Sequence, residues 1–280
     1  MKEITSQQLS ELVKKLCIEA NTVLPQDLCH AICEARKEEA SPVGQAVLGD
    51  LKENFEFARE KGLPICQDTG MAVVFVEWGQ DCHLVDGSLE QAVNQGVADG
   101  YIQGHLRLSV VGDPLRRVNT QSNTPAIVHL QMVPGDTVTI TVAPKGFGSE
   151  NMTRMKMFRP SVTQQQVEDF IVEAVSLAGS NPCPPVVVGV GLGGTSEKAA
   201  ILAKRALLRP VDQWNVDSFY REMEQRLLER INHLGIGPQG LGGTTTALTV
   251  AIEPFGTHIA GLPCVVNLGC HVTRHSSGTL

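Results

Sequence analysis

The 280-residue sequence has few aromatic residues, no block of basic residues and no long apolar run, and each absence excludes something. No apolar run approaches the roughly 18 residues that a membrane-spanning helix needs. The formal net charge is −7 and Lys and Arg are not clustered, which argues against a dedicated binder of nucleic acid or of anionic membranes. The polar start MKEITSQQLSEL lacks the apolar core of a secretion signal, so we expect a cytoplasmic protein.

What the chain does have is apolar residues at 42%, together with 27 Gly and eight Cys. This apolar fraction and length suffice for a sizeable buried core. In a reducing cytosol, cysteines with a role are more often metal ligands or nucleophiles than disulfide partners. The question is therefore which of the eight cysteines carry chemistry.

The N-terminal segment 1–62 has the pattern of helices. Thr5 and Gln8 form a capping-box pattern before apolar residues at helical spacing. Pro25 and Pro42 indicate the starts of a second and a third helix, and Gly62 the end of the third.

Beyond residue 62, strand and helix patterns are mixed. We expect further helices at 88–104, 161–178, 196–208 and 217–234, and strands at 71–78, 126–132, 136–143, 185–190, 246–253 and 264–268. Val133-Pro134-Gly135 predicts a hairpin between the second and third of these strands. The pattern predicts an α+β (mixed α/β) fold in which a helical N-terminal part precedes mixed sheets flanked by helices, with residues 1–280 as a single domain.

Three cysteines, Cys66, Cys183 and Cys270, differ from the other five because they lie in glycine- or proline-rich loops. Such loops let the backbone approach a ligand closely. The remaining cysteines follow helical patterns or flank strands and are expected to be small buried hydrophobes: Cys17, Cys29, Cys33, Cys82 and Cys264.

Loop cysteines so far apart in sequence fit no zinc-finger spacing. They are compatible with an iron–sulfur cluster that is held by three thiolates and keeps one iron open as a Lewis acid. Composition alone leaves this as one alternative among several.

Two alternatives to a catalytic cluster are a dinucleotide-binding site and a redox-sensing role. The sequence GVGLGG at 189–194 satisfies the dinucleotide-binding pattern, and Asp212 stands near the distance at which that fold needs an acidic residue. No apolar strand precedes Asp212, so a tight strand-to-helix turn is the better interpretation. The chain could also be a structural subunit whose cluster only senses redox state, although its open glycine-rich loops argue against this.

Several motifs, in order along the chain, resemble the class I (iron–sulfur) fumarases and the related L(+)-tartrate dehydratases, in their α subunit or N-terminal domain. They are CQDTG at 66–70, KGFGSEN at 145–151, NPCPP at 181–185 with the stretch to Thr195, and IGPQG at 236–240. The resemblance also includes residues 106–114 and 119–126, and it covers essentially the whole chain.

The resemblance implies a catalytic [4Fe-4S] cluster on Cys66, Cys183 and Cys270. It further implies a set of substrate-binding residues, namely Gln67, Asp68, Arg107, Gly146 and Gly148. His258, twelve residues before Cys270, resembles an active-site histidine of the family, so Asp68 and His258 are the expected catalytic residues.

The implied reaction is the reversible hydration of fumarate to (S)-malate, with L(+)-tartrate dehydration as the alternative. The motifs at 113–126 resemble the fumarase branch more closely. In the family a threonine proposed to move the C3 proton belongs to the C-terminal domain, so we expect a β subunit as partner, in an (αβ)2 or higher oligomer. A dicarboxylate substrate needs cations and N–H donors around both carboxylates, and Asp68 could orient water or a proton-transfer group.

Overall fold

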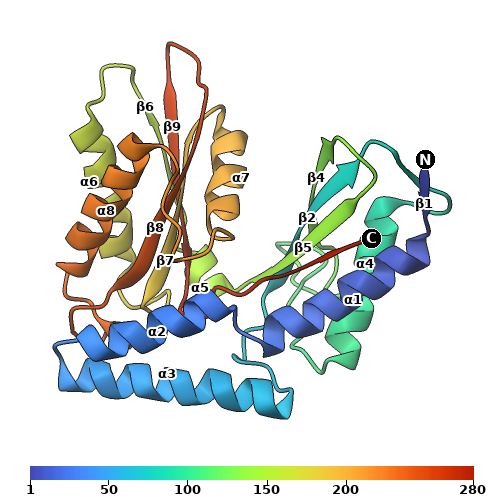
Figure 1. Ribbon diagram of the computed structural model, residues 1–280, viewed down its shortest axis with the longest axis horizontal. Coiled ribbons are helices and arrows are strands. Elements are labelled where there is room, and N and C mark those ends of the chain that lie inside the picture. Colours follow the sequence, from blue (N-terminus) through green and yellow to red (C-terminus); the bar gives the residue numbers. More distant parts are fainter. The chain divides into compact units, whose positions relative to one another are not determined.

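The computed structural model describes residues 1–280, which form two compact units interleaved along the sequence (Figure 1). Unit 1 comprises Met1–Pro25, Phe55–Phe147 and Arg274–Leu280, and unit 2 comprises Gln26–Asn54 and Gly148–Thr273. Helices and mixed sheets occur in both, which confirms the α+β fold class. The expectation of a single domain over 1–280 stays a prediction.

Unit 1 is built on a four-stranded sheet with the order β10-β5-β2-β4. Its elements are β1 (Lys2–Ile4), α1 (Ser6–Thr22), β2 (Met71–Gly79), β3 (Cys82–Leu84), α4 (Leu89–Gln103), β4 (Ile127–Val133), β5 (Val138–Lys145) and β10 (Ser276–Thr279). The capping box of Thr5 and Gln8 is present at the start of α1, and Ser88 caps α4 as expected.

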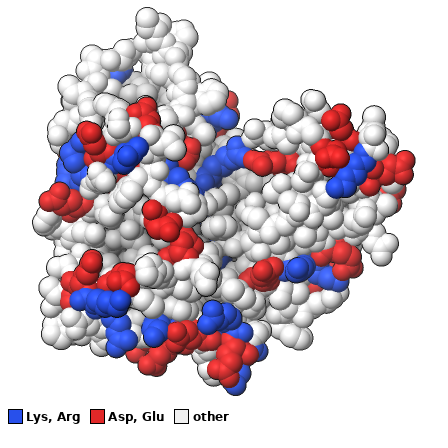
Figure 2. Space-filling view, viewed as in Figure 1, with Lys and Arg blue, Asp and Glu red and all other residues white.

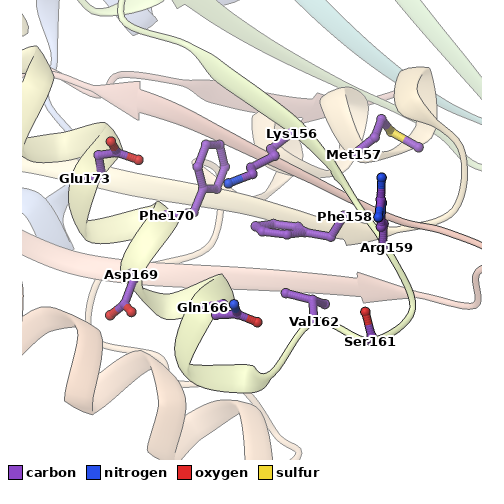
Figure 3. A pocket seen from close by; sticks show the side chains of 10 residues that line it. All are labelled: Lys156, Met157, Phe158, Arg159, Ser161, Val162, Gln166, Asp169, Phe170 and Glu173. Carbon is purple, nitrogen blue, oxygen red and sulfur yellow. The ribbon is translucent and has the colours of Figure 1, made fainter.

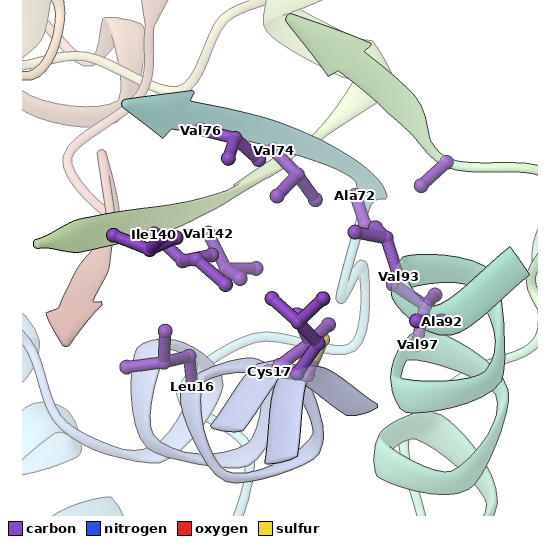
Figure 4. Packing of buried hydrophobic residues seen from close by; sticks show 14 of the residues in the cluster. Leu16, Cys17, Ala72, Val74, Val76, Ala92, Val93, Val97, Ile140 and Val142 are labelled. Carbon is purple, nitrogen blue, oxygen red and sulfur yellow. The ribbon is translucent and has the colours of Figure 1, made fainter. Parts of the chain in front are cut away.

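The core of unit 1 lies between this sheet and the helices α1 and α4 (Figure 4). Val74 of β2 and Val142 of β5 point toward Leu16 and Cys17 of α1, and all four are buried. Buried and half-buried residues alternate along β5, because every second side chain of a strand points to the face that the helices cover. Burial of these apolar side chains is the main stabilising contribution in unit 1.

The predicted hairpin between 126–132 and 136–143 is wrong. Both strands form, as β4 and β5, but β2 lies between them, parallel to β4 and antiparallel to β5. A nine-residue strand that is buried along nearly its whole length gains more by occupying the centre of the sheet than an edge position.

Unit 2 contains the second four-stranded sheet, with the order β6-β9-β7-β8. Its elements are α2 (Gln26–Glu38), α3 (Pro42–Lys61, which runs on into unit 1), α5 (Phe147–Glu150, which begins at the last residue of unit 1), β6 (Arg154–Phe158), α6 (Gln164–Ala178), β7 (Val186–Gly193), α7 (Ser196–Ala206), α8 (Ser218–Asn232), the 3-10 turn η1 (Pro238–Gly240), β8 (Ala247–Phe255) and β9 (Leu262–Gly269).

Helices cover both faces of this sheet, with α7 on one face and α6 and α8 on the other (Figure 1). The strand β9 runs antiparallel to β7, and Val187 pairs with Gly269. The loop that enters β7 and the loop that leaves β9 therefore lie at the same end of the sheet. These are the loops that carry Cys183 and Cys270.

The glycines of the segment 189–194 serve the packing of α7 on the sheet. A β-carbon on Gly189 would overlap the Ala203 carbonyl oxygen, and one on Gly191 would overlap that of Ala199, so α7 lies directly against the backbone of β7. Asp212 lies in a loop after α7 and in no strand. Residues 189–193 belong to β7, and only Gly193 and Gly194, both with positive φ, form the strand-to-helix turn that was expected for the whole motif. No strand ends at Asp212, where a dinucleotide fold would need one.

The helical expectation for 1–62 is confirmed by α1, α2 and α3, which are preceded by the short strand β1. Among all the helices, none combines the length and the apolar character needed to cross a bilayer.

Candidate functional site

In unit 1, Asp68 shapes the loop that follows Cys66. Its Oδ1 accepts the backbone N–H of Gly70 at 3.0 Å, and its Oδ2 accepts that of Phe147 at 2.9 Å. Gly146 lies close beside it, because a β-carbon there would be 3.3 Å from Oδ2. The half-buried carboxylate therefore holds the CQDTG loop against the start of the glycine-rich segment 146–151.

The next residue, Thr69, connects this loop to Tyr101 and Arg107. The Tyr101 hydroxyl donates to the Thr69 carbonyl at 2.7 Å, and burial raises the pKa of the Tyr101 phenol, so it remains a donor. The Arg107 backbone N–H donates to Thr69 Oγ1 at 2.9 Å, which leaves the Arg107 side chain exposed beside the loop. Gln67, between Cys66 and Asp68, is also exposed.

Arg274 is the buried cation of this region, with only 4% of its surface exposed. Its Nη2 donates to the Asp68 carbonyl oxygen, whereas its Nε and Nη1 are buried without a hydrogen-bond partner. A buried guanidinium with orphaned donors is costly unless an anion completes it. Nothing local in the sequence distinguishes Arg274 from a solvated arginine.

In unit 2, the loops that carry Cys183 and Cys270 are bonded to each other at one end of the sheet. The His271 backbone N–H donates to the Cys183 carbonyl at 3.4 Å, and His271 Nδ1 lies 3.0 Å from the same oxygen. Cys183 is exposed and adopts the left-handed backbone conformation, with φ at 54°. Cys270 is half-buried.

The donor set of these loops suits an iron–sulfur cluster. Neither Cys183 nor Cys270 is in a disulfide, and the Val272 backbone N–H donates to Cys270 Sγ at 3.3 Å. N–H donors to ligand sulfurs are a normal feature of iron–sulfur sites. Cys66, also in no disulfide, belongs to unit 1, and no three His, Cys, Asp or Glu side chains are grouped as a metal site.

His258 lies apart from these two cysteines. It is exposed in the connection between β8 and β9, where its Nδ1 accepts the Ala260 N–H at 3.1 Å. Cys270 follows the opposite end of β9. Eight residues of strand at roughly 3.3 Å each put about 26 Å between the two ends. Within unit 2 the structure therefore does not bring His258 together with Cys183 and Cys270.

The glycine-rich segment is anchored in unit 2 by Glu150. Its carboxylate pairs with Lys204 of α7 at 2.6 Å and accepts from the side-chain amide of Asn267 of β9 at 2.8 Å. Gly148, just upstream, lies close to the Cys183 loop, because a β-carbon there would be 3.3 Å from the Asn181 carbonyl oxygen. The same contact region borders a pocket of about 530 Å3 that includes Asn181 and Arg154 in its lining.

A larger pocket of about 670 Å3 lies between β6 and α6 (Figure 3). Lys156 Nζ lies 4.9 Å from the centre of the Phe158 ring and 5.6 Å from that of Phe170, a cation–π arrangement that accounts for its position. Phe158 pairs with Leu262 at the start of β9. This pocket is therefore at the end of the sheet remote from Cys270.

The expectation for the other cysteines is confirmed for Cys17, Cys82 and Cys264, which are buried. Burial raises the pKa of the Cys17 and Cys264 thiols to about 12, so both remain protonated and inert. Cys29 and Cys33 are half-buried on α2.

On the face drawn in Figure 2, acidic and basic side chains are interspersed.

Comparison with known proteins gives a consistent result. The sequence profile of the family described as fumarate hydratase (fumerase) matches residues 10–279. A relative from Methanocaldococcus jannaschii, provisionally named L(+)-tartrate dehydratase subunit alpha, is 38% identical over 275 residues, or 96% of each chain. L(+)-tartrate dehydratase subunit alpha of Escherichia coli O157:H7 is 34% identical over 288 residues, which cover 100% of this chain and 94% of the relative. The counterpart in Escherichia coli K12 is 33% identical with the same coverage.

Proposed function

The chain belongs to the fumarate hydratase family and is a hydro-lyase, and we propose that it is the cluster-bearing α subunit of a [4Fe-4S] enzyme that hydrates fumarate reversibly to (S)-malate. The observation that carries the proposal is the junction of the Cys183 and Cys270 loops at one end of the unit 2 sheet. That junction puts two of the three expected ligands on neighbouring loops.

Cys66, Cys183 and Cys270 would hold the cluster. When bound, an iron that lacks a protein thiolate supplies Lewis-acid chemistry toward a substrate oxygen. The Val272 N–H that donates to Cys270 Sγ supports this assignment, because it stabilises negative charge on the sulfur.

The chain's own residues would bind and orient the dicarboxylate. Arg107 offers an exposed guanidinium beside the CQDTG loop, and Arg274 offers the two orphaned donors described above. Gln67 is exposed in the same loop, while Asp68 holds the loop and the backbone at Gly146 in position. Cations and N–H donors arranged before the reaction stabilise the second negative charge that develops when the C3 proton leaves.

Gly148 would contribute by close approach of the backbone rather than by a side chain. His258 is left out of the proposed site, because it lies at the far end of the sheet that carries Cys183 and Cys270. The residue that moves the C3 proton would then come from a β subunit, consistent with relatives that are named α subunits. We propose an (αβ)2 or higher assembly as well, to be tested by the mass of the co-purified complex.

L(+)-tartrate dehydration is the second candidate, and the names of the relatives favour it. Tartrate carries one more hydroxyl than malate, so a site that hydrogen-bonds this hydroxyl would discriminate strongly against malate. The decisive assay uses the chain co-purified anaerobically with its β partner and compares turnover of fumarate, (S)-malate and both tartrate enantiomers.

The cluster is tested on the isolated chain. Anaerobic reconstitution should give a brown protein with about four irons per chain. Cys66→Ser, Cys183→Ser and Cys270→Ser should each abolish iron retention, because a thiolate ligand is lost. Cys17→Ser and Cys33→Ser serve as matched controls and should retain iron. A colourless, iron-free wild-type protein, or equal iron loss in both groups, would overturn the assignment.

A further inference from the structure

Gln239 lies where the two cysteine loops of unit 2 meet, and the proposed reaction assigns it no role. Its side-chain Nε2 is 2.8 Å from the Pro184 carbonyl oxygen and 3.1 Å from His271 Nδ1. Pro184 directly follows Cys183, and His271 directly follows Cys270. One amide nitrogen thus contacts both loops, each at the residue after its cysteine.

The hydrogen-bond chemistry of this contact is specific. An amide nitrogen carries two N–H donors and accepts nothing, so one proton goes to Pro184 O and the other faces His271 Nδ1. His271 Nδ1 also lies 3.0 Å from the Cys183 carbonyl oxygen, so the tautomer with a bare Nδ1 accepts from Gln239, whereas the tautomer with an Nδ1–H donates to Cys183. In either tautomer, Gln239 Nε2 donates to Pro184 O and His271 contacts the Cys183 loop, so the two loops are joined.

The backbone conformation around Gln239 directs its side-chain amide toward Pro184 and His271. Gln239 itself is left-handed, with φ at 53°, and its backbone N–H also donates to Pro184 O at 2.8 Å. Gly237 has φ at 69° and packs so closely against Gly242 that a β-carbon could not be accommodated. A non-glycine residue in the left-handed region costs about 1 kcal/mol or more, so surrounding contacts must maintain it.

We propose that Gln239 is a positioning residue that sets the spacing of Cys183 and Cys270 before any cluster binds. This inference rests on the proposed function for the meaning of that spacing, but the spacing itself is a property of the metal-free chain. The two cysteines are 87 residues apart in sequence; the pairing of β7 with β9 brings their loops to one end of the sheet, and cross-loop bonds of this kind restrain the loops there. Residues that orient metal ligands through hydrogen bonds typically change metal affinity 10- to 100-fold when replaced.

The first test uses the metal-free protein. A bifunctional thiol reagent of short, fixed span bridges Cys183 to Cys270, and peptide mapping follows the rate. Gln239→Glu keeps the shape of the side chain but removes both donors at neutral pH, and Gln239→Ala removes the side chain. Both should slow bridging about tenfold relative to the control Gln213→Ala, which changes an exposed glutamine of the same unit.

The second test follows iron release to a chelator from anaerobically reconstituted protein. Gln239→Glu and Gln239→Ala should release iron about 10-fold faster or more, while Gln213→Ala should match the wild type. Circular dichroism melting distinguishes a folded variant from a collapsed one, and Gln239→Glu, the near-isosteric change, decides the outcome if Gln239→Ala fails to fold. Bridging at the wild-type rate in Gln239→Glu would overturn the positioning role. A wild-type chain that binds no iron but shows the bridging difference would overturn the cluster alone.

Discussion

Replacement of Glu39 should reveal a large, pH-dependent contribution to the stability of unit 2. Glu39 is only 1% exposed and follows the last residue of α2. Its Oε1 accepts the backbone N–H groups of Ser41 at 2.9 Å and Thr244 at 2.8 Å, and its Oε2 accepts that of Thr245 at 2.8 Å. One carboxylate thereby joins the turn between α2 and α3 to the segment that enters β8.

The pKa of Glu39 gives the size of its contribution to the free energy of unfolding. Burial alone would raise this pKa, but the hydrogen bonds from Ser41, Thr244 and Thr245 outweigh burial and lower it from 4.5 to about 2. A depressed carboxyl pKa stabilises the folded state above the unfolded-state value and loses that effect as the pH falls through the folded-state value. The shift corresponds to about 3 kcal/mol at neutral pH, all of it lost between about pH 4.5 and pH 2.

The assay is urea unfolding of the chain and of Glu39→Gln at pH 7 and at about pH 3, with amide hydrogen exchange at Thr244 and Thr245 as the local readout. At pH 7, Glu39→Gln should lose about 3 kcal/mol, because an amide lacks the charge and turns a donor toward backbone donors. At about pH 3 the difference should shrink to less than half. The neighbouring, exposed Glu38→Gln should change little. A Glu39→Gln deficit that is absent at pH 7, or is the same at both pH values, would refute the reasoning.

Two further predictions concern packing and substrate binding. Gly191→Ala should destabilise unit 2 by about 3 kcal/mol in chemical unfolding, because its β-carbon would overlap the backbone of α7, whereas Gly261→Ala, with open space around it, should be neutral. In the assembled enzyme, Arg274→Gln should raise KM for the dicarboxylate about 10-fold or more, while the exposed Arg116→Gln should not. An unchanged KM in Arg274→Gln would remove Arg274 from the substrate site.

Local features of the fold were predictable because their causes are local. The capping box at Thr5 and the cap at Ser88 are set by residues within one turn of each other, and both helix starts were located correctly. Strand order was not predictable in this way. The β2 strand inserts between β4 and β5 because of burial over the whole unit, which no turn signal at 133–135 encodes. The edge strand β6 was missed because it is only five residues long, is exposed except at Phe158, and contains no β-branched residue.

The three loop cysteines of the candidate site were also predictable from local sequence. Glycine and proline beside Cys66, Cys183 and Cys270 mark loops whatever the tertiary structure, so the separation of these three from the buried cysteines needed only composition. Arg274 bonds to Asp68, far away in the sequence, and the motif that contains Gln239 does not reveal its bond to Pro184. Residues whose roles arise from long-range hydrogen bonds are the ones that sequence reasoning passes over.

His258 was predicted from its resemblance to an active-site histidine, and its catalytic role stays a prediction, but its closeness to Cys270 along the chain is not closeness in space within unit 2. Twelve residues separate it from Cys270. In a helix, with a rise of about 1.5 Å per residue, these residues would span roughly half the length that they span in a strand. Here β9 (Leu262–Gly269) occupies most of that interval, and an extended strand carries its ends apart by about 26 Å. The apolar sequence LPCVV at 262–266, which favours a strand, already contains this information. Placing a side chain from its distance to a motif therefore requires the secondary structure of the intervening residues first, because the same twelve residues can join two groups or separate them across a sheet.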